Sequence, residues 1–535
     1  MRAHIRKPLS ARHSRKKRLL TLLTSRLFII VVLILLQLFL LLFTLVELGT
    51  RQYWVSVAFN ILSFLMVLWI LPREDNPSYK ISWIILIMAV PLVGGIFYLM
   101  FGMKRNSRRM AQQIDSYTRS LLHRDHGKVT LNPNDSLLQP TPLQQLSLID
   151  PMLGRQAGYI SSTSGFEVYR NTQVEYFSLG ESFYQRLLEQ LRGAKKFILM
   201  EYFIVQHGKM WDSILRVLEE RQQHGVQVRI LYDDVGCVTT LPAMYSEQLR
   251  QKGFQVGVFN PFHPRLNAAT NYRDHRKICV IDGNVGFTGG INLADEYING
   301  YEKHGHWKDT AILLKGEAVF SLTTMFLSMW DYLIKKEGED YAAYYPDSWD
   351  ENAQGIVQPF ADNPLDDEAV GETVYLNLIN KAKRYVYITT PYLILSNEMV
   401  TAMNTAAKSG VDVRIITPHV PDKWYVHAVS RSYYEMLVEA GVKIYEYTPG
   451  FVHAKTFVVD DEYAVVGTIN LDYRSLYLHF ECAAWMYKAS CVTDVRDDFL
   501  KTQQMSQEIT LEECRNISIP RRLGRSVLRV LAPLM

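Results

Sequence analysis

The stretch that decides the fold is His-Arg-Lys-Ile-Cys-Val-Ile-Asp at residues 275–282, which returns as His-Ala-Lys-Thr-Phe-Val-Val-Asp at residues 453–460. In both copies the histidine precedes the lysine by two residues, and the lysine precedes the aspartate by five. A glycine-containing element follows, and then an asparagine ten residues beyond each aspartate, at Asn292 and Asn470. A lone His-x-Lys often arises by chance, but repetition of the whole pattern indicates a duplicated unit with a shared site.

The chain upstream of each motif is duplicated as well. Each copy alternates β-branched segments with helical stretches that end in a glycine, the usual C-terminal stop of a helix. The predicted strands are residues 197–203, 226–231 and 254–259 in the first copy and residues 385–392, 411–416 and 442–447 in the second. This alternation predicts an α/β fold of two similar lobes related by a pseudo-two-fold axis.

The residue types of the motif suit phosphoryl chemistry. Side chains two apart on a strand share a face, so His275 should project with Lys277, and His453 with Lys455. A neutral imidazole can attack phosphorus, and a charged one can protonate a departing alkoxide. Lysine supplies positive charge for the phosphoryl oxygens, and the asparagine adds a neutral donor. One copy offers a nucleophile without an acid, whereas two facing copies supply both.

Four carboxylates complete the candidate site. Asp282 and Asp460 close the two motifs and are catalytic candidates, with an anchoring role at the end of the strand as the alternative. Each histidine also needs a partner for its second ring nitrogen. Glu481 and Asp309 are candidates for that orienting role, and ordinary surface positions are the alternative for both.

The N-terminus is basic and then apolar. Residues 1–26 carry nine lysines and arginines and no acid, and the apolar runs cover residues 27–46, 53–71 and 81–101. Each run is long enough to approach a hydrocarbon core of about 30 Å, which predicts a membrane anchor. Pro91, Gly94 and Gly95 could instead bend the third run into a re-entrant or interfacial hairpin, so the topology stays open.

Composition narrows the function further. The net charge of +4 is small for 535 residues and argues against a dedicated nucleic-acid-binding protein. The five cysteines are widely spaced and form no Cys-x-x-Cys pair, so no zinc site or disulfide framework is expected. At the C-terminus, arginines alternate with apolar residues between Arg515 and Leu531. Such a helix could lie on an anionic membrane leaflet or pack on a lobe.

Six regions follow from these patterns. They are a basic tail (1–26), a transmembrane region (27–103), a linker (104–160), a first lobe (161–355), a second lobe (356–510) and a basic amphipathic tail (511–535).

The paired motifs resemble the phospholipase D superfamily, whose signature is His-x-Lys-x4-Asp followed by Gly, a small residue, any residue and Asn. The resemblance covers roughly residues 135–510. With its apolar N-terminus, the chain is similar to the bacterial cardiolipin synthases of that superfamily. Gly290 and Thr468 stand where serine is common, and both are small enough to leave activity in place. The first apolar run looks like an addition to a two-segment anchor.

The resemblance implies a reaction. It implies two α/β lobes with the site between them, no metal or other cofactor, and a phosphohistidine intermediate. The substrates would be two phosphatidylglycerol molecules, and the products cardiolipin and glycerol. By analogy His275 attacks and His453 serves as acid and base, although the roles could be reversed. The residues expected to hold the phosphoryl oxygens are Lys277, Lys455, Asn292 and Asn470.

Three alternatives stay open. The chain could be a phospholipase D hydrolase, a phosphatidyltransferase for another head group, or a catalytically retired membrane scaffold. The expected location is the bacterial cell membrane, with several membrane crossings. Oligomeric state, acyl-chain preference and the side of the membrane that carries the lobes are not determined by the sequence.

Overall fold

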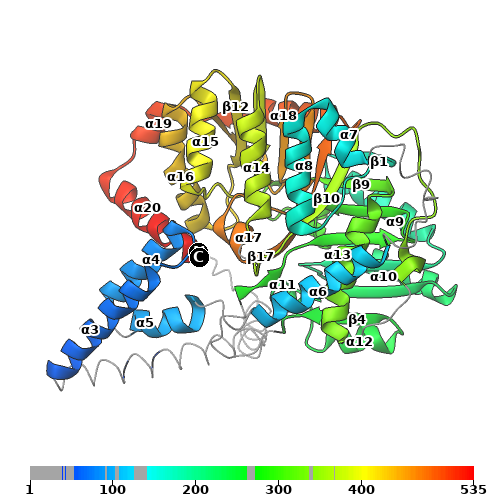
Figure 1. The fold of residues 1–535 in the computed structure, drawn as a ribbon, viewed down its shortest axis with the longest axis horizontal. Helices are drawn as coiled ribbons and strands as arrows, with labels where there is room; N and C mark the ends of the chain where they lie inside the picture. Colours follow the sequence, from blue (N-terminus) through cyan, green and yellow to red (C-terminus); the bar gives the residue numbers. More distant parts are fainter. Residues whose placement is uncertain are drawn as a thin grey trace, which may run out of the picture.

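Two α/β lobes pack side by side, and a helical N-terminal region extends from one side of them (Figure 1). The computed structural model describes residues 39, 43, 53–90, 93–102, 108–125, 141–261, 271–335, 341–366 and 368–534.

The first lobe is built on a seven-stranded sheet. Its strands, in spatial order, are β1 (Thr172–Phe177), β9 (Ala311–Gly316), β7 (Val285–Gly289), β6 (Lys277–Ile281), β2 (Phe197–Tyr202), β3 (Gln227–Asp233) and β4 (Gln255–Phe259). β2, β3 and β4 run parallel, because a helix crosses over between them. The helices of this lobe include α9 (Gly180–Arg192), α10 (Lys209–Gln223), α12 (Tyr245–Gln251) and α13 (Val319–Ile334).

The second lobe repeats this order. Its strands are β10 (Ile356–Asp362), β17 (His479–Tyr487), β16 (Tyr463–Gly467), β15 (Thr456–Val459), β11 (Tyr385–Thr389), β12 (Asp412–Pro418), β13 (Lys443–Tyr447) and the added edge strand β18 (Ser506–Glu508). Its helices include α14 (Val370–Lys381), α15 (Asn397–Lys408), α16 (Trp424–Glu439), α17 (Tyr473–Tyr477) and α18 (Val492–Gln504). The predicted pair of similar α/β lobes is confirmed.

The lobes share a core, and short strands of one lobe pair with strands of the other. Helix α13 is buried at thirteen of its sixteen positions, and one apolar cluster joins it to strand residues of both lobes. The short strand β5 (Arg273–Asp274) pairs with the start of β17, and β8 (His306–Lys308) pairs with β14 (Gly450–Val452). The chain around each motif is therefore held by the opposite lobe.

The N-terminal region differs from the expectation of three long spans. Run 53–71 forms α3 (Tyr53–Ile70), whereas run 81–101 is divided among α4 (Pro77–Ala89), α5 (Val93–Phe97) and the π-helix η1 (Tyr98–Gly102). Run 27–46 lies outside the described residues except at positions 39 and 43. Within the described part of the chain, no helix has both the length and the apolar character needed to cross a membrane.

The region assigned as a linker also differs from its prediction. It contains α6 (Arg108–Asp125), α7 (Pro142–Ile149) and most of α8 (Pro151–Ser164). Helix α8 buries Leu153, Ala157 and Ile160 in the core of the second lobe. These apolar residues are widely spaced among Gly, Ser and Thr, so composition alone does not predict the helix. The C-terminal tail forms α19 (Leu511–Arg515), α20 (Ile519–Leu531) and the 3-10 turn η6 (Ala532–Leu534).

Candidate active site

The two motif histidines lie where the chain passes between lobes. His275 follows β5 and precedes β6, and its backbone N–H donates to Phe480 of the second lobe at 2.9 Å. His453 follows β14, and its N–H donates to Lys308 of the first lobe at 2.7 Å. The prediction that each histidine stands on one continuous strand is therefore wrong. The strand is interrupted because its upstream part pairs with the other lobe.

Each histidine is paired with a carboxylate from the opposite lobe. Nδ1 of His275 lies 2.9 Å from both carboxylate oxygens of Glu481, and Nδ1 of His453 lies 2.6 Å from Oδ2 of Asp309. All four side chains are buried, with exposures of 7% for each histidine and 0% for each carboxylate. With Nδ1–H directed at a carboxylate, Nε2 carries the free lone pair. Neither of these two pairs can therefore form within one lobe.

The two carboxylates have different surroundings. Glu481 also accepts hydrogen bonds from the hydroxyls of Thr468 and of Ser475, the latter at 2.5 Å. Asp309 accepts instead from the N–H of Thr310 at 2.8 Å. A Cβ at Gly290 would lie 2.1 Å from Oδ1 of Asp309, so a serine at this position would collide with the carboxylate. Glycine at 290 and threonine at 468 thus fit their own carboxylates.

The two motif lysines are buried in the same site. Lys277 and Lys455 are each 1% exposed, and each donates to the carbonyl of the histidine in its own motif. Burial lowers the pKa of Lys277 to about 8 and that of Lys455 to about 7, although Glu481 and Asp309 favour the charged forms. Two ammonium groups so close together and so desolvated are suited to bind an anion.

Both histidines are neutral at physiological pH. Burial and the nearby Lys277 and Lys455 hold the pKa of His275 well below its usual 6.5. Burial and Lys455 lower the pKa of His453 to about 4, against an opposing contribution from Asp309. A neutral imidazole is the nucleophilic form, and it becomes basic when a bound phosphate neutralises the lysines.

The depressed lysine pKa values predict an alkaline decline in activity. The charged ammonium groups bind phosphate, and they lose their protons as pH rises through about 7 to 8. We therefore expect kcat/KM to fall on that side, while kcat changes less because bound phosphate keeps the lysines charged. Lys455→Arg should move the decline to higher pH. A decline unchanged by Lys455→Arg would assign it to another group.

The two asparagines lie beside the site and are engaged to different extents. Asn292 accepts from the N–H of Ile204 at 3.0 Å and donates to the hydroxyl of Tyr297 at 2.7 Å. Asn470 is 5% exposed, and its side-chain oxygen has no hydrogen-bond partner among the described residues. A buried amide without a partner at its oxygen is free to reorient toward a ligand.

The motif aspartates lie at the far end of the motif strands. Asp282 follows β6, and its carboxylate accepts from the backbone N–H groups of Lys195, Lys196 and Phe197 at 2.7–2.9 Å. Asp460 follows β15 and binds residues 383–385 in the same way, at 2.7–2.9 Å. Both aspartates have positive φ, at 54° and 57°. This geometry fixes the start of the neighbouring central strand and supports the anchoring alternative.

Asp460→Asn should therefore lower stability rather than chemistry. Asparagine tolerates the left-handed backbone but leaves at least one of the three N–H groups without its charged acceptor. We expect a loss of about 1–3 kcal/mol in unfolding free energy. The activity per folded molecule should stay within a few-fold of wild type. Thermal unfolding and turnover of the same preparation check this, and a large loss of kcat at an unchanged midpoint would contradict it.

His479 belongs to neither motif, and no sequence pattern singles it out. It is 8% exposed, both ring nitrogens lack a hydrogen bond among the described residues, and its ring centroid lies 5.3 Å from that of His275. His275, His479 and Glu481 form the one group of potential metal ligands found in the described chain. The carboxylate is already bound by three donors, and two lysines stand beside it. The group therefore suits an anion better than a cation.

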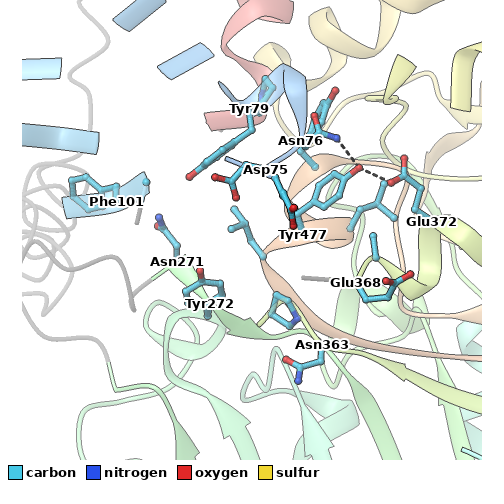
Figure 2. A pocket seen from close by; sticks show the side chains of 18 residues that line it. Asp75, Asn76, Tyr79, Phe101, Asn271, Tyr272, Asn363, Glu368, Glu372 and Tyr477 are labelled. Atoms are coloured by element: carbon cyan, nitrogen blue, oxygen red, sulfur yellow. Dashed lines mark hydrogen bonds between the residues drawn. The ribbon is translucent and has the colours of Figure 1, made fainter. Parts of the chain in front are cut away.

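A separate cavity lies where the N-terminal helices, both lobes and the C-terminus meet (Figure 2). Its volume is about 270 Å³. Its described lining contains four carboxylates and no lysine, arginine or histidine, so it does not suit a phosphate. Asn76 donates to the hydroxyl of Tyr477, which donates in turn to Glu372. These bonds tie the N-terminal helices to the second lobe.

Comparison with known proteins places this geometry in a family. A family model described as cardiolipin synthase, phospholipase D-like domain, matches residues 187–330 and 375–503, and a phospholipase D-nuclease N-terminal model matches residues 61–102. An uncharacterised Streptococcus mutans protein is 43% identical over 88% of this chain and 99% of its own. A cardiolipin synthase from Alkalihalophilus pseudofirmus is 35% identical over 91% of this chain and 96% of its own.

A solved structure supports the fold. The phosphatidylserine synthase of Haemophilus influenzae aligns with a TM-score of 0.53 at 16% identity, covering 71% of this chain and 98% of its own. At that identity the likeness concerns the two-lobed fold alone. From the family model and the curated relatives, the chain belongs to the cardiolipin synthase family with phospholipase D-like domains.

Proposed function

We propose that the chain transfers a phosphatidyl group from one phosphatidylglycerol to another, forming cardiolipin and releasing glycerol. The observation that carries this is the reciprocal pair of buried dyads, His275–Glu481 and His453–Asp309, around two buried lysines. Such a site supplies two imidazoles and positive charge for one phosphodiester. Several relatives are named cardiolipin synthases, which supports cardiolipin as the product, and phosphatidylglycerol is the substrate that the resemblance implies.

When the bound phosphodiester neutralises the charge of Lys277 and Lys455, His453 takes up a proton at Nε2 from solvent. Nε2 of His275 then attacks phosphorus, the bond from phosphorus to the glycerol oxygen breaks, and His453 gives that oxygen its proton. His453 then takes a proton from a hydroxyl of the second phosphatidylglycerol, whose oxygen displaces His275 from phosphorus. Lys277 and Lys455 hold the phosphoryl oxygens throughout, and Asn470 adds a donor. The reaction is reversible because one phosphodiester replaces another.

The unequal surroundings of the two carboxylates support this division of roles. A nucleophile must stay neutral, whereas an acid–base residue must become a stable imidazolium. Glu481 shares its charge among three side-chain donors, which weakens its pull on a proton of His275. Among the described residues, the side chain that donates to Asp309 is His453, at 2.6 Å, and Asp309 raises the pKa of that histidine against the effect of burial. His453 is thus better suited to carry the proton.

The proposed site of action is the cell membrane of a bacterium. Both substrates and the product are lipids, and the apolar N-terminal region and basic C-terminal tail would hold the lobes at the bilayer. The two lobes of this arrangement would span residues 161–355 and 356–510. Duplex nucleic acid is a poor candidate partner, because the net charge of +4 is too small for phosphate-backbone binding.

The decisive experiment supplies purified protein with vesicles of pure phosphatidylglycerol. We expect cardiolipin and glycerol in equal amounts, measured by mass spectrometry and an enzymatic glycerol assay. Phosphatidic acid as the main product would identify a hydrolase, and transfer only to an added alcohol would identify another head-group specificity. No turnover, together with none in a His275→Ala control, would identify a scaffold. Both intact dyads argue against that last alternative.

A further inference from the structure

Helix α20 exposes the face that a surface helix normally buries. Along Ile519–Leu531, Ile519 is 83% exposed, Leu523 65%, Val527 52% and Val530 40%. These four residues recur at helical spacing and form one stripe along the helix, here called the apolar stripe. No residue of α20 is buried. The described part of the chain therefore leaves the stripe facing outward.

The opposite side of the helix carries arginines and packs on the second lobe. The guanidinium carbon of Arg529 lies 4.2 Å from the ring centroid of Tyr433 on α16, and Arg522 lies 3.7 Å from Glu435. Leu528 packs against the core of the second lobe. An ordinary surface helix turns its apolar face to the protein and its charges to water, and α20 does the reverse.

Two further arginines of α20 have no acidic partner. Among the described residues, neither Arg521 nor Arg525 has a carboxylate within ion-pair distance. Burial, and then the neighbouring Arg431 and Arg521, lower the pKa of Arg525. Trp424, 73% exposed, lines a groove beside these arginines. By helical spacing, Arg521 and Arg525 lie on the side of α20 opposite the apolar stripe, and such a division between apolar and basic sides is typical of helices at the water–lipid interface.

The apolar stripe adjoins the apolar N-terminal helices. Ser82 of α4 donates to the backbone carbonyl of Val530 at 2.6 Å, and Leu534 packs on the small core of the N-terminal helices. Figure 1 shows α20 beside α4, with the C-terminus at the same corner. Exposed apolar side chains continue along these helices at Leu65, Leu68, Ile81, Ile85 and Met88. The bonds in Figure 2 hold this group on the second lobe.

We propose that α20 lies in the head-group region of an anionic bilayer, with its apolar stripe among the acyl chains and Arg521 and Arg525 on lipid phosphates. Guanidinium groups bind phosphate through two parallel hydrogen bonds, and a helix of this pattern lies in the plane of the interface. Each arginine near an anionic surface strengthens membrane partitioning roughly five-fold. The proposal concerns location, so it stands whichever lipid reaction the site performs.

Spin labels on the full-length chain test the location. In a Cys514→Ser background the other four cysteines are buried, so a label can be placed at Leu523→Cys, with Glu398→Cys on α15 as the control. In vesicles containing phosphatidylglycerol, we expect oxygen, which dissolves in lipid, to relax the label at 523 more than a water-soluble nickel complex does. The label at 398 should show the opposite order. A water-exposed label at 523 would overturn the proposal.

Two further measurements distinguish a lipid bilayer from a second copy of the chain on the stripe, and lipid phosphate from free phosphate. Dipolar coupling between labels at 523 of two chains, without contact to lipid, would show a second copy on the stripe and overturn the proposal. Vesicles of phosphatidylcholine with added inorganic phosphate should leave the label in water, because free phosphate supplies no acyl layer. The double variant Arg521→Gln/Arg525→Gln should weaken vesicle binding by about 25-fold. An unchanged affinity would remove the arginines from the proposal.

Discussion

Replacing His453 by alanine should arrest the enzyme as a phosphatidyl-histidine at position 275. The second imidazole donates the first proton and accepts the next, so its removal slows turnover on phosphatidylglycerol by about 10⁴-fold or more. A phosphatidyl ester of p-nitrophenol does not need the missing proton donor, because p-nitrophenolate leaves without being protonated. The variant should then release one equivalent of p-nitrophenol per site and stop, since no base activates the acceptor.

The covalent product distinguishes the two histidines. With substrate labelled at phosphorus and an alkaline quench, label should remain on the His453→Ala protein and be absent from His275→Ala. The opposite pattern would exchange the roles, and label on neither variant would refute a covalent intermediate. Imidazole added to the medium provides a matched control. It should restore turnover to His453→Ala by replacing the missing base, whereas a variant that failed to fold would gain nothing.

The fold was predictable from the sequence to the extent that it is repetitive. Glycine stops and β-branched strands recur in both copies, so β2, β3 and β4 and their partners β11, β12 and β13 could be assigned. The pairing of strands between the two lobes could not be predicted. β5 is two residues long, and its pairing with β17 depends on a partner about two hundred positions away. Local patterns contain no information on such contacts.

The site shows the same division. Repetition of the motif is enough to identify His275, Lys277, His453 and Lys455. In the structure Glu481 and Asp309 bind the two histidines, as expected of orienting partners. From the sequence Thr468 is only a small residue after a glycine, whereas in the structure its hydroxyl donates to Glu481. His479 escaped notice because its importance depends on burial beside His275. A residue that joins the site only through folding cannot be recognised from the spacing of residues in the sequence.

Replacing Glu481 by glutamine should reduce kcat by about 10³- to 10⁴-fold while leaving the fold intact. The carboxylate fixes the tautomer of His275 with Nε2 free, as a carboxylate does for the histidine of serine proteases, where the amide variant loses about 10⁴-fold. Glutamine keeps the shape. Thr468 donates to Oε2 and Ser475 to Oε1, so the amide oxygen can accept from one of these hydroxyls while the amide nitrogen donates to the other. Its amide nitrogen, however, then faces Nδ1 and favours the tautomer with the proton on Nε2.

Asp309→Asn is the matched variant, because it alters the dyad of His453 in the same way. With the p-nitrophenyl ester, Glu481→Gln should lose its initial burst, since attack by His275 is impaired. Asp309→Asn should keep the burst and lose the subsequent turnover, since only acceptor activation is impaired. Equal loss of both phases in both variants would show that each carboxylate serves the whole site. Each carboxylate comes from the lobe opposite its histidine. A loss in either variant would therefore show that the histidine of one lobe needs the carboxylate of the other for its chemistry.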